Sequence, residues 1–125
     1  MLRILLIVGA GGFLGSVARY LAAKYIQQTV LSPFPYGTFW VNILGCFLIG
    51  LFYGLSERSG VMSNELRLFL TVGFCGGFTT FSSFTNENFI LIQNGQFLTA
   101  FVYILGSVLV GILSVYIGYL ISNLL

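Results

Sequence analysis

Histidine and aspartate are absent from this chain of 125 residues, and only eight of its side chains are charged. Without histidine, neither a Ser-His nor a Cys-His pair is available, so acid-base or nucleophilic catalysis of the familiar kinds has almost no raw material. The sequence therefore predicts a protein that is not an enzyme. A net charge of +2 from so few charged residues also leaves no basic patch, so nucleic acid is not an expected partner.

Cysteine is scarce as well, and neither cysteine has the neighbours that a metal or redox site needs. Cys46 and Cys75 lie in apolar runs without CxxC spacing, so we expect both to be packing residues. Apolar residues, in contrast, are abundant: 58% of the chain is hydrophobic, 6% is charged, and the mean hydropathy is +1.00. Soluble domains carry about 25% charged residues, so this composition predicts a membrane protein.

Four stretches reach the roughly 20 mostly apolar residues that a membrane-spanning helix needs. They are residues 2–25, 37–55, 66–92 and 97–124. The segments between them are short. The first contains Pro33 and Pro35, and the last, "QNGQ", has a central glycine, as expected for loops and turns. The sequence thus predicts an all-α membrane protein in which residues 1–125 form a single four-helix transmembrane domain.

The positively charged residues give the chain almost no preferred orientation. Arg3, Arg58 and Arg67 fall on the side of the N-terminus, and Arg19 and Lys24 fall on the other side. The side richer in Lys and Arg normally faces the cytoplasm, but three against two is a minimal difference. Two interpretations stay open: a cytoplasmic N-terminus, or insertion in both orientations, which would give an antiparallel, dual-topology homodimer.

The third stretch contains an unusual polar segment, "GGFTTFSSFTNEN", at residues 76–88. Glycine has a low helix propensity, and hydroxyl side chains bond to nearby backbone and compete with the helical hydrogen bonds. We therefore predict a break in the third helix, with freed carbonyls that suit a cation. The alternative is a continuous helix whose hydroxyls bond back to their own carbonyls.

Several polar and aromatic residues are candidates for a transport pathway, because polar groups at membrane depth are expensive and usually functional where they converge. Phe81 and Phe84 are three apart and would share a helix face, and the positive edges of their rings favour a small anion. Asn42 supplies an amide in the second stretch, and Tyr103 and Ser107 share a face in the fourth. The alternative is that all of them only pack helices together.

Two charged residues lie near the ends of their stretches. Arg19 comes late in the first stretch, where it can extend to the membrane interface. Glu87 comes late in the third stretch. It either reaches the interface or is held by a partner such as Arg19.

Three motifs resemble the Fluc (CrcB) family of fluoride channels, and the resemblance covers essentially the whole chain. They are "GGFLGSVARY" at residues 11–20, "GTFWVNILGCFLIG" at 37–50 and "GFCGGFTTFSSFTNE" at 73–87. The resemblance implies a dual-topology homodimer whose antiparallel subunits enclose two fluoride pores. It also implies a structural Na⁺ at the dimer centre, held by backbone carbonyls that map to Gly76 and Thr79, where the glycines and the first threonine break the third helix.

The same resemblance assigns roles to side chains. Phe81 and Phe84 resemble the ring-edge ligands of fluoride, and Asn42 resembles the amide donor that faces them. The other residues expected to line or support the pore are Thr80, Ser82, Ser83, Tyr103 and Ser107. Arg19 and Glu87 match family positions and are expected in a vestibule or in the supporting structure. The implied function is passive export of fluoride from the cytoplasm across the cell (inner or plasma) membrane, which limits fluoride toxicity.

Two other functions compete with this one. A proton-coupled small multidrug exporter is also built from four short spans, but its mechanism needs an acid in the first span, and this first stretch has none. Glu87 would then be the only proton carrier, and Glu87→Gln would abolish transport. A purely structural membrane subunit would instead tolerate Leu or Ile at Phe81 and Phe84.

Overall fold

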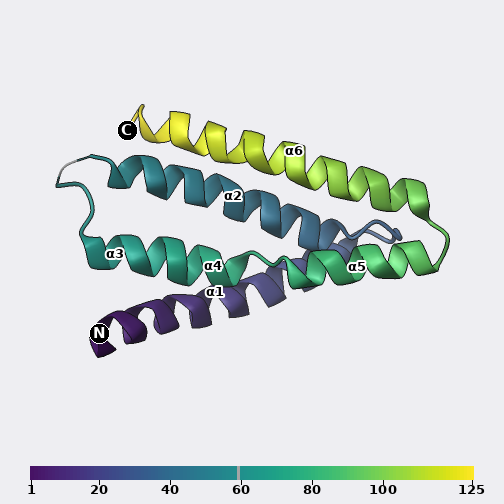
Figure 1. Cartoon of the computed structure of the whole chain (residues 1–125), viewed down its shortest axis with the longest axis horizontal. Helices are drawn as coiled ribbons and strands as arrows, with labels where there is room; N and C mark the ends of the chain where they lie inside the picture. Colours follow the sequence, from purple (N-terminus) through teal and green to yellow (C-terminus); the bar gives the residue numbers. More distant parts are fainter. Residues whose placement is uncertain (59) are drawn as a thin grey trace.

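The computed structural model of the protein describes residues 1–58 and 60–125. Within these residues, four helical segments are long and apolar enough to cross a membrane: α1 (Leu2–Thr29), α2 (Tyr36–Ser56), a composite third segment (Asn64–Gln93) and α6 (Phe97–Ser122). The predicted all-α, four-helix architecture is confirmed. α6 packs along α2, and α1 packs against the first half of the third segment (Figure 1).

Turn residues determine where the helices begin and end. Pro35 directly precedes α2, a position where the missing N–H of proline does no harm. The Gln27 side chain near the end of α1 accepts a hydrogen bond from the N–H of Gly37 at 3.0 Å, and this bond ties the end of α1 to the start of α2. Before α6, Gly95 has a φ of +76°, a backbone conformation that favours glycine.

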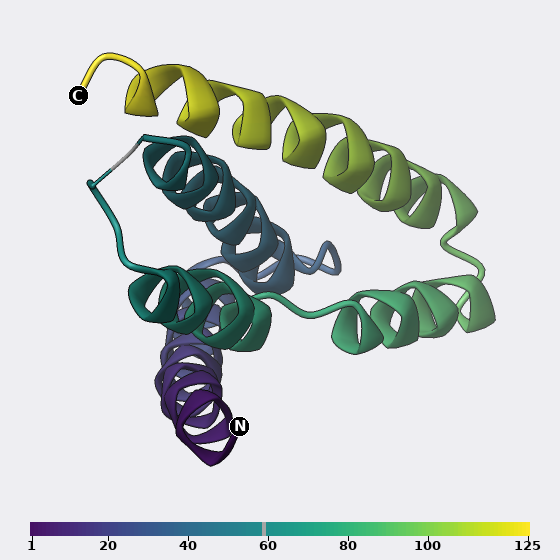
Figure 2. The same cartoon turned by 60° about the vertical axis from the view of Figure 1, so that its left-hand side comes forward.

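The third segment is interrupted, as predicted. It consists of α3 (Asn64–Leu68), the π-helix η1 (Phe69–Cys75), α4 (Gly76–Phe78) and α5 (Ser82–Gln93). Thr79 has a φ of −95° and a ψ of 159°, an extended conformation. The chain therefore leaves helical geometry between α4 and α5, and Figure 2 shows this stretch as non-helical chain. The alternative of a continuous helix is wrong.

The break lies at a different place from the paired glycines that were expected to cause it. Gly76 has helical angles, a φ of −61° and a ψ of −38°, and Gly77 also belongs to α4. Gly77 is instead required for packing, because a methyl group on it would lie 2.6 Å from the carbonyl oxygen of Gly12 on α1. The helix ends at Thr79, whose hydroxyl donates to the carbonyl of Cys75 at 2.9 Å.

Other glycines, which recur at GxxxG spacing, also bring helices together. A methyl group on Gly11 of α1 would lie 2.5 Å from the carbonyl oxygen of Phe69 on η1. One on Gly50 of α2 would overlap the carbonyl of Val115 on α6. Lipid provides no hydrophobic drive between helices, so this close backbone approach is a main source of helix association.

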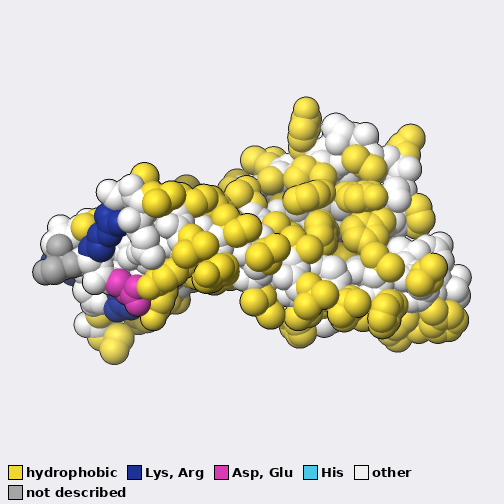
Figure 3. Space-filling model, turned by 90° about the horizontal axis from the view of Figure 1, so that it is seen from above, with side chains coloured by type: hydrophobic (Ala, Val, Ile, Leu, Met, Phe, Trp, Pro, Cys, Tyr) yellow, Lys and Arg dark blue, Asp and Glu magenta, His cyan; other side chains and the backbone are white. Residues whose placement is uncertain are grey.

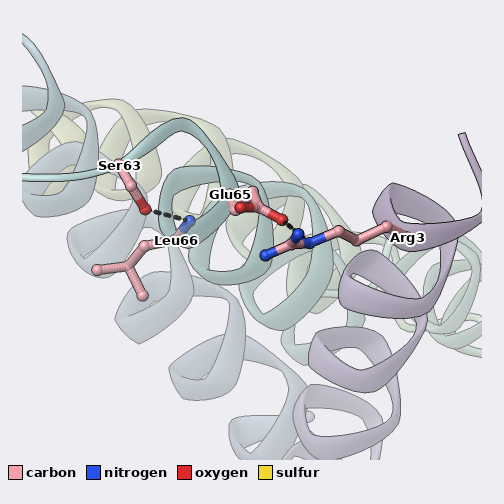
Figure 4. A network of polar contacts seen from close by, with 4 residues as sticks. All are labelled: Arg3, Ser63, Glu65 and Leu66. Atoms are coloured by element: carbon pink, nitrogen blue, oxygen red, sulfur yellow. Dashed lines mark hydrogen bonds and ion pairs between the residues drawn. The ribbon is translucent and has the colours of Figure 1, made fainter.

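Both termini lie at one end of the molecule, together with the connection between α2 and α3 (Figure 1). At this end Arg3 Nε and Glu65 Oε2 form an ion pair of 2.5 Å, and the N–H of Leu66 donates to Ser63 Oγ at 3.1 Å (Figure 4). On the face drawn in Figure 3, charged side chains gather at this end and apolar side chains predominate over the rest. This distribution suits helices whose bodies lie in lipid and whose ends reach water.

Candidate functional site

A groove of about 420 Å³ lies beside the break in the third segment. Its walls come from α2, η1, α4, the break, α5 and α6. Seven residues singled out from the sequence line it together: Asn42, Gly76, Thr79, Thr80, Phe81, Phe84 and Ser107. Of the described residues that line the groove, none carries a charge. The structure thus gathers polar and aromatic groups from three separate stretches around one neutral path.

Asn42 of α2 is bonded to the break itself. Its Nδ2 donates to the carbonyl oxygen of Thr80 at 3.0 Å, and the N–H of Thr80 donates to its Oδ1 at 2.8 Å. Backbone groups that leave a helix at membrane depth need partners inside the protein, and Asn42 supplies both. An amide nitrogen carries two hydrogens, so one Asn42 N–H remains for the groove.

Thr80 also bonds to the first turn of α5, whose N-cap residue is Phe81. Its Oγ1 accepts a hydrogen bond from the N–H of Ser83 at 3.2 Å and lies 3.5 Å from Oγ of Ser82. This bond satisfies one of the N–H groups in the first turn of α5, which have no partner within the helix. Ser83 thus contributes its backbone N–H to this bond, and its side chain lies outside the groove lining.

The aromatic side chains divide between the groove and the interior. Phe81 is 76% exposed, and its ring centroid lies 5.8 Å from that of Phe84. Phe84 in turn meets Tyr103 of α6 edge to face, at 4.9 Å and 64°. Phe78, three residues before Phe81, is only 5% exposed and stacks on Phe74 at 5.6 Å. The break separates Phe78 from the other two, so the three rings do not form one stripe.

Glu87 of α5 is held by two hydroxyl groups. Thr38 Oγ1 donates to Glu87 Oε2 at 2.7 Å, and the hydroxyl of Tyr103 donates to Oε1 at 2.8 Å. Tyr103 is fully buried, so its hydroxyl is committed to this carboxylate. Thr38 was missed in the sequence analysis, although it lies four residues before Asn42 and so shares a helix face with it. Thr38, Glu87 and Tyr103 form a polar cluster next to the groove. The ring of Tyr103 contacts Phe84, and Phe84 lines the groove.

Known protein sequences match this chain along nearly its whole length. A family model described as "CrcB-like protein, Camphor Resistance (CrcB)" matches residues 6–119. The chain belongs to the CrcB family. This membership confirms the family resemblance that the three sequence motifs indicated. Together with the four apolar helices, it makes the chain a multi-pass membrane protein.

Individual members of the CrcB family are similar over most of their own length as well. A protein of Phocaeicola vulgatus named "Fluoride-specific ion channel FluC" is 50% identical over 122 residues, which cover 98% of this chain and 100% of the relative. Proteins of the same name in Flavobacterium psychrophilum and Bacteroides fragilis are 48% and 50% identical, over 116 and 111 residues. These alignments cover 93% and 86% of this chain and 94% and 87% of the two relatives.

In this CrcB protein, Arg19 and Glu87 form hydrogen bonds with different partners. Arg19 Nε donates to the carbonyl oxygen of Gly77 at 3.0 Å, so α1 is tied to the last turn before the break. The expectation that Arg19 could hold Glu87 is wrong, because Glu87 is bonded to Thr38 and Tyr103. Arg19 and Glu87 both lie outside the groove lining and stabilise elements that adjoin it.

Ser107 of α6 differs from the other polar residues of the site. Its Oγ is buried and has no hydrogen-bond partner within residues 1–58 and 60–125, although the side chain lines the groove. A buried hydroxyl without a partner loses stabilisation relative to one that is bonded. Such an atom is expected where a ligand or water completes the bond.

Proposed function

We propose that this protein is a fluoride-selective channel through which fluoride leaves the cytoplasm passively. The relatives named fluoride-specific ion channel support this, since they are 48–50% identical over most of their length. The observation that carries the proposal is the groove. It places two phenyl rings, hydroxyls and an amide on one path, and none of the described residues that line it is charged.

The groove offers the kind of ligands that a small anion needs for passage. Fluoride holds its water tightly, so a pore must replace that water with close donors and still release the ion. The ring edges of Phe81 and Phe84 carry positive potential, and Ser107 and the second Asn42 N–H are free to donate. Because these groups are neutral, they bind the ion more weakly than a buried Arg or Lys would.

The direction of transport follows from the chemistry of fluoride. In an acidic medium, fluoride is partly protonated to HF, which crosses lipid and loses its proton at the neutral pH of the cytoplasm. The anion is then trapped, and a potential that is negative inside drives it outward by about 2.3 kcal/mol per 100 mV. A passive channel in the cell membrane therefore suffices to limit fluoride toxicity.

A second, antiparallel copy of the chain is part of the proposal. In one chain the groove is open on one side, where Phe81 is 76% exposed. Non-helical backbone at membrane depth must be covered by protein or line a watery cavity, so the open side needs a cover. The near-equal numbers of Lys and Arg on the two sides support insertion in both orientations, which would supply an antiparallel partner.

A structural Na⁺ at the dimer centre is also proposed, and the backbone around the break fits one. The carbonyls of Cys75, Gly77 and Thr80 accept hydrogen bonds. The N–H of Thr80, which would reach Gly76 in a continuous helix, is bonded to Asn42 instead. Among the described residues, the carbonyls of Gly76 and Thr79 are therefore left for another partner. Carbonyls of unwound helices are ligands that suit Na⁺.

A proton-coupled exporter is the competing function, and the site favours it less. Such an exporter needs a carboxylate that meets both its substrate and water. Glu87 is the only acidic residue late in the third segment. Both of its oxygens accept hydrogen bonds from hydroxyls of the protein, and it lies outside the groove lining.

The proposal is tested with purified protein in liposomes loaded with potassium fluoride. Valinomycin is added so that potassium can follow, and external fluoride is measured with a selective electrode. We expect rapid fluoride efflux, no efflux from chloride-loaded vesicles, and loss of fluoride efflux in Phe81→Ile. Phe101→Ile is the matched control, because Phe101 is an exposed phenylalanine of α6 outside the groove. Well-folded protein without fluoride efflux, or equal loss in both variants, would refute the proposal.

A further inference from the structure

The loop between α1 and α2 places one aromatic ring against the polar cluster beside the groove. The partly buried ring of Phe34 meets the ring of Tyr103 edge to face, with centroids 5.2 Å apart and planes at 70°. Tyr103 meets Phe84 in the same manner, at 4.9 Å and 64°. Phe34 lies outside the groove lining, whereas Phe84 belongs to it. The fully buried ring of Tyr103 thus connects a ring of the loop to a ring of the proposed fluoride path.

Phe34 has little conformational freedom within this loop. It stands between Pro33 and Pro35, and a proline fixes its own φ and restricts the residue before it. The N–H of Phe34 donates to Ser32 Oγ at 3.2 Å. Its ring also meets Phe39 of α2 edge to face, at 5.7 Å and 69°. The backbone and the packing therefore hold this ring in one place.

The side chain of Gln27, near the end of α1, ties this loop to its surroundings. Its Nε2 donates to the carbonyl oxygens of Ser32 and Phe34, at 3.4 and 3.5 Å. Its Oε1 accepts from the N–H of Gly37 at the start of α2. The bonds of Gln27 therefore reach the chain on both sides of Pro35.

We propose that Phe34 is a positioning residue of the fluoride path: it fixes the ring of Tyr103 and, through it, the ring of Phe84. Gln27 acts through Phe34 by holding the loop. The inference rests on the proposed function. The edge of a phenyl ring is positive and its face is negative, so the angle of Phe84 decides whether its ring attracts or repels an anion.

The contacts of Tyr103 and Phe84 explain why a further support is needed. Glu87 accepts from the hydroxyl of Tyr103, but a hydrogen bond at the tip of the ring does not stop rotation about the ring axis. On the groove side, Phe84 meets Phe81, which is mostly exposed and so is little confined by this chain. The angle of Phe84 is therefore set on its buried side, where Phe34 packs against Tyr103.

The experiment compares Phe34→Leu with wild type in fluoride-loaded liposomes, over a series of internal fluoride concentrations. We expect the half-saturating fluoride concentration to rise by about three- to tenfold, the factor that an edge-to-face aromatic contact contributes to an equilibrium. Phe34→Trp keeps an aromatic ring, and Phe34 lines a pocket of about 240 Å³ that gives room for it, so this variant should restore the wild-type value. Phe97→Leu, an exposed phenylalanine of α6, is the control and should leave the value unchanged.

A second pair of variants tests the loop without changing an aromatic ring. Gln27→Ala should raise the half-saturating fluoride concentration at least about twofold, because it removes hydrogen bonds that hold the loop. Gln28→Ala should leave it unchanged, since Gln28 is the next residue and is exposed. Equal values for these two variants would refute the role of Gln27.

The geometry of the rings is measured separately from transport, by ¹⁹F NMR of the full-length protein labelled with 3-fluorotyrosine in detergent. The signal that disappears in Tyr103→Phe belongs to Tyr103. We expect Phe34→Leu to shift this signal and Phe97→Leu to leave it in place. An unshifted signal in Phe34→Leu would show that Phe34 does not position Tyr103.

The two kinds of measurement separate a positioning role from a structural one. If Phe34→Leu only reduces the number of folded channels, the maximal efflux falls while the half-saturating concentration stays at its wild-type value, and this result would overturn the inference but leave the channel proposal intact. Wild-type protein without any fluoride efflux would instead refute the channel proposal and, with it, the transport role of Phe34.

Discussion

The bonds between Asn42 and Thr80 determine whether the break in the third segment is stable. Asn42→Ala removes both hydrogen bonds and leaves the N–H and C=O of Thr80 without a partner. Each buried backbone group left unbonded costs about 1–3 kcal/mol, which gives about 2–6 kcal/mol for two. The measured contribution of a side-chain hydrogen bond in a membrane protein is smaller, about 0.6–1.7 kcal/mol, because the unfolded chain in the membrane also finds partners. We therefore expect a loss of roughly 2–3 kcal/mol in the free energy of unfolding.

Two measurements read out this loss. Unfolding in detergent micelles gives the free energy, and amide hydrogen exchange shows where the protein opens. A change of about 2 kcal/mol is a factor of roughly 30 in an equilibrium, so exchange of the Thr80 amide should speed up by that factor while exchange in α6 changes little.

Asn94→Ala is the matched control for the same substitution. Asn94 lies after α5 and is exposed, so its loss should change the free energy of unfolding by no more than about 0.5 kcal/mol. If the two variants unfold alike and Thr80 exchanges at its wild-type rate, Asn42 does not hold the break, and our account of the third segment is wrong.

Three further substitutions test neighbouring contacts. Gly15→Ala should destabilise the protein by about 1–3 kcal/mol, because its methyl group would overlap the carbonyl of Phe74. Gly9→Ala is the control and should not destabilise it, because the space around Gly9 is open. Equal melting temperatures of the two variants would contradict the close packing at Gly15. Tyr103→Phe keeps the ring but removes the hydrogen bond to Glu87, so the free energy of unfolding should fall by about 1.5–3 kcal/mol. An unchanged free energy of unfolding would count against that hydrogen bond. Glu87→Gln should retain fluoride efflux within tenfold, and its abolition would favour the proton-coupled exporter.

Hydropathy and length were enough to find the four helices, because a membrane span needs a long apolar run whatever its neighbours are. The break was also predictable, since the residues after Gly77 are rich in hydroxyls that compete for backbone. Its exact place was not, because local propensity assigned Gly76 and Gly77 to the break. Close packing against Gly12 of α1 explains Gly77 instead, and such a contact between distant residues leaves no local signal.

The hydrogen-bond partners of the charged residues could likewise not be predicted from a single sequence. Charge alone suggested Arg19 for Glu87, yet Arg19 bonds the carbonyl of Gly77, and Glu87 bonds Thr38 and Tyr103. Backbone carbonyls and hydroxyls are acceptors and donors everywhere in a chain, so sequence cannot single one out. Helical spacing could have pointed to Thr38, which shares a face with Asn42, but only once that face was known to meet α5.

The selectivity of the groove for an ion would come from hydrogen-bond donors that have no partner within the protein. Thr80 is bonded to Asn42 and to the first turn of α5, and Tyr103 is bonded to Glu87, so these residues shape the path more than they contact an ion. Two buried side-chain atoms lack a partner within the described residues, Ser107 Oγ and Asn88 Oδ1. Only the hydroxyl can donate a hydrogen bond, and only Ser107 lines the groove. A passing fluoride would complete the bond that the protein itself leaves open.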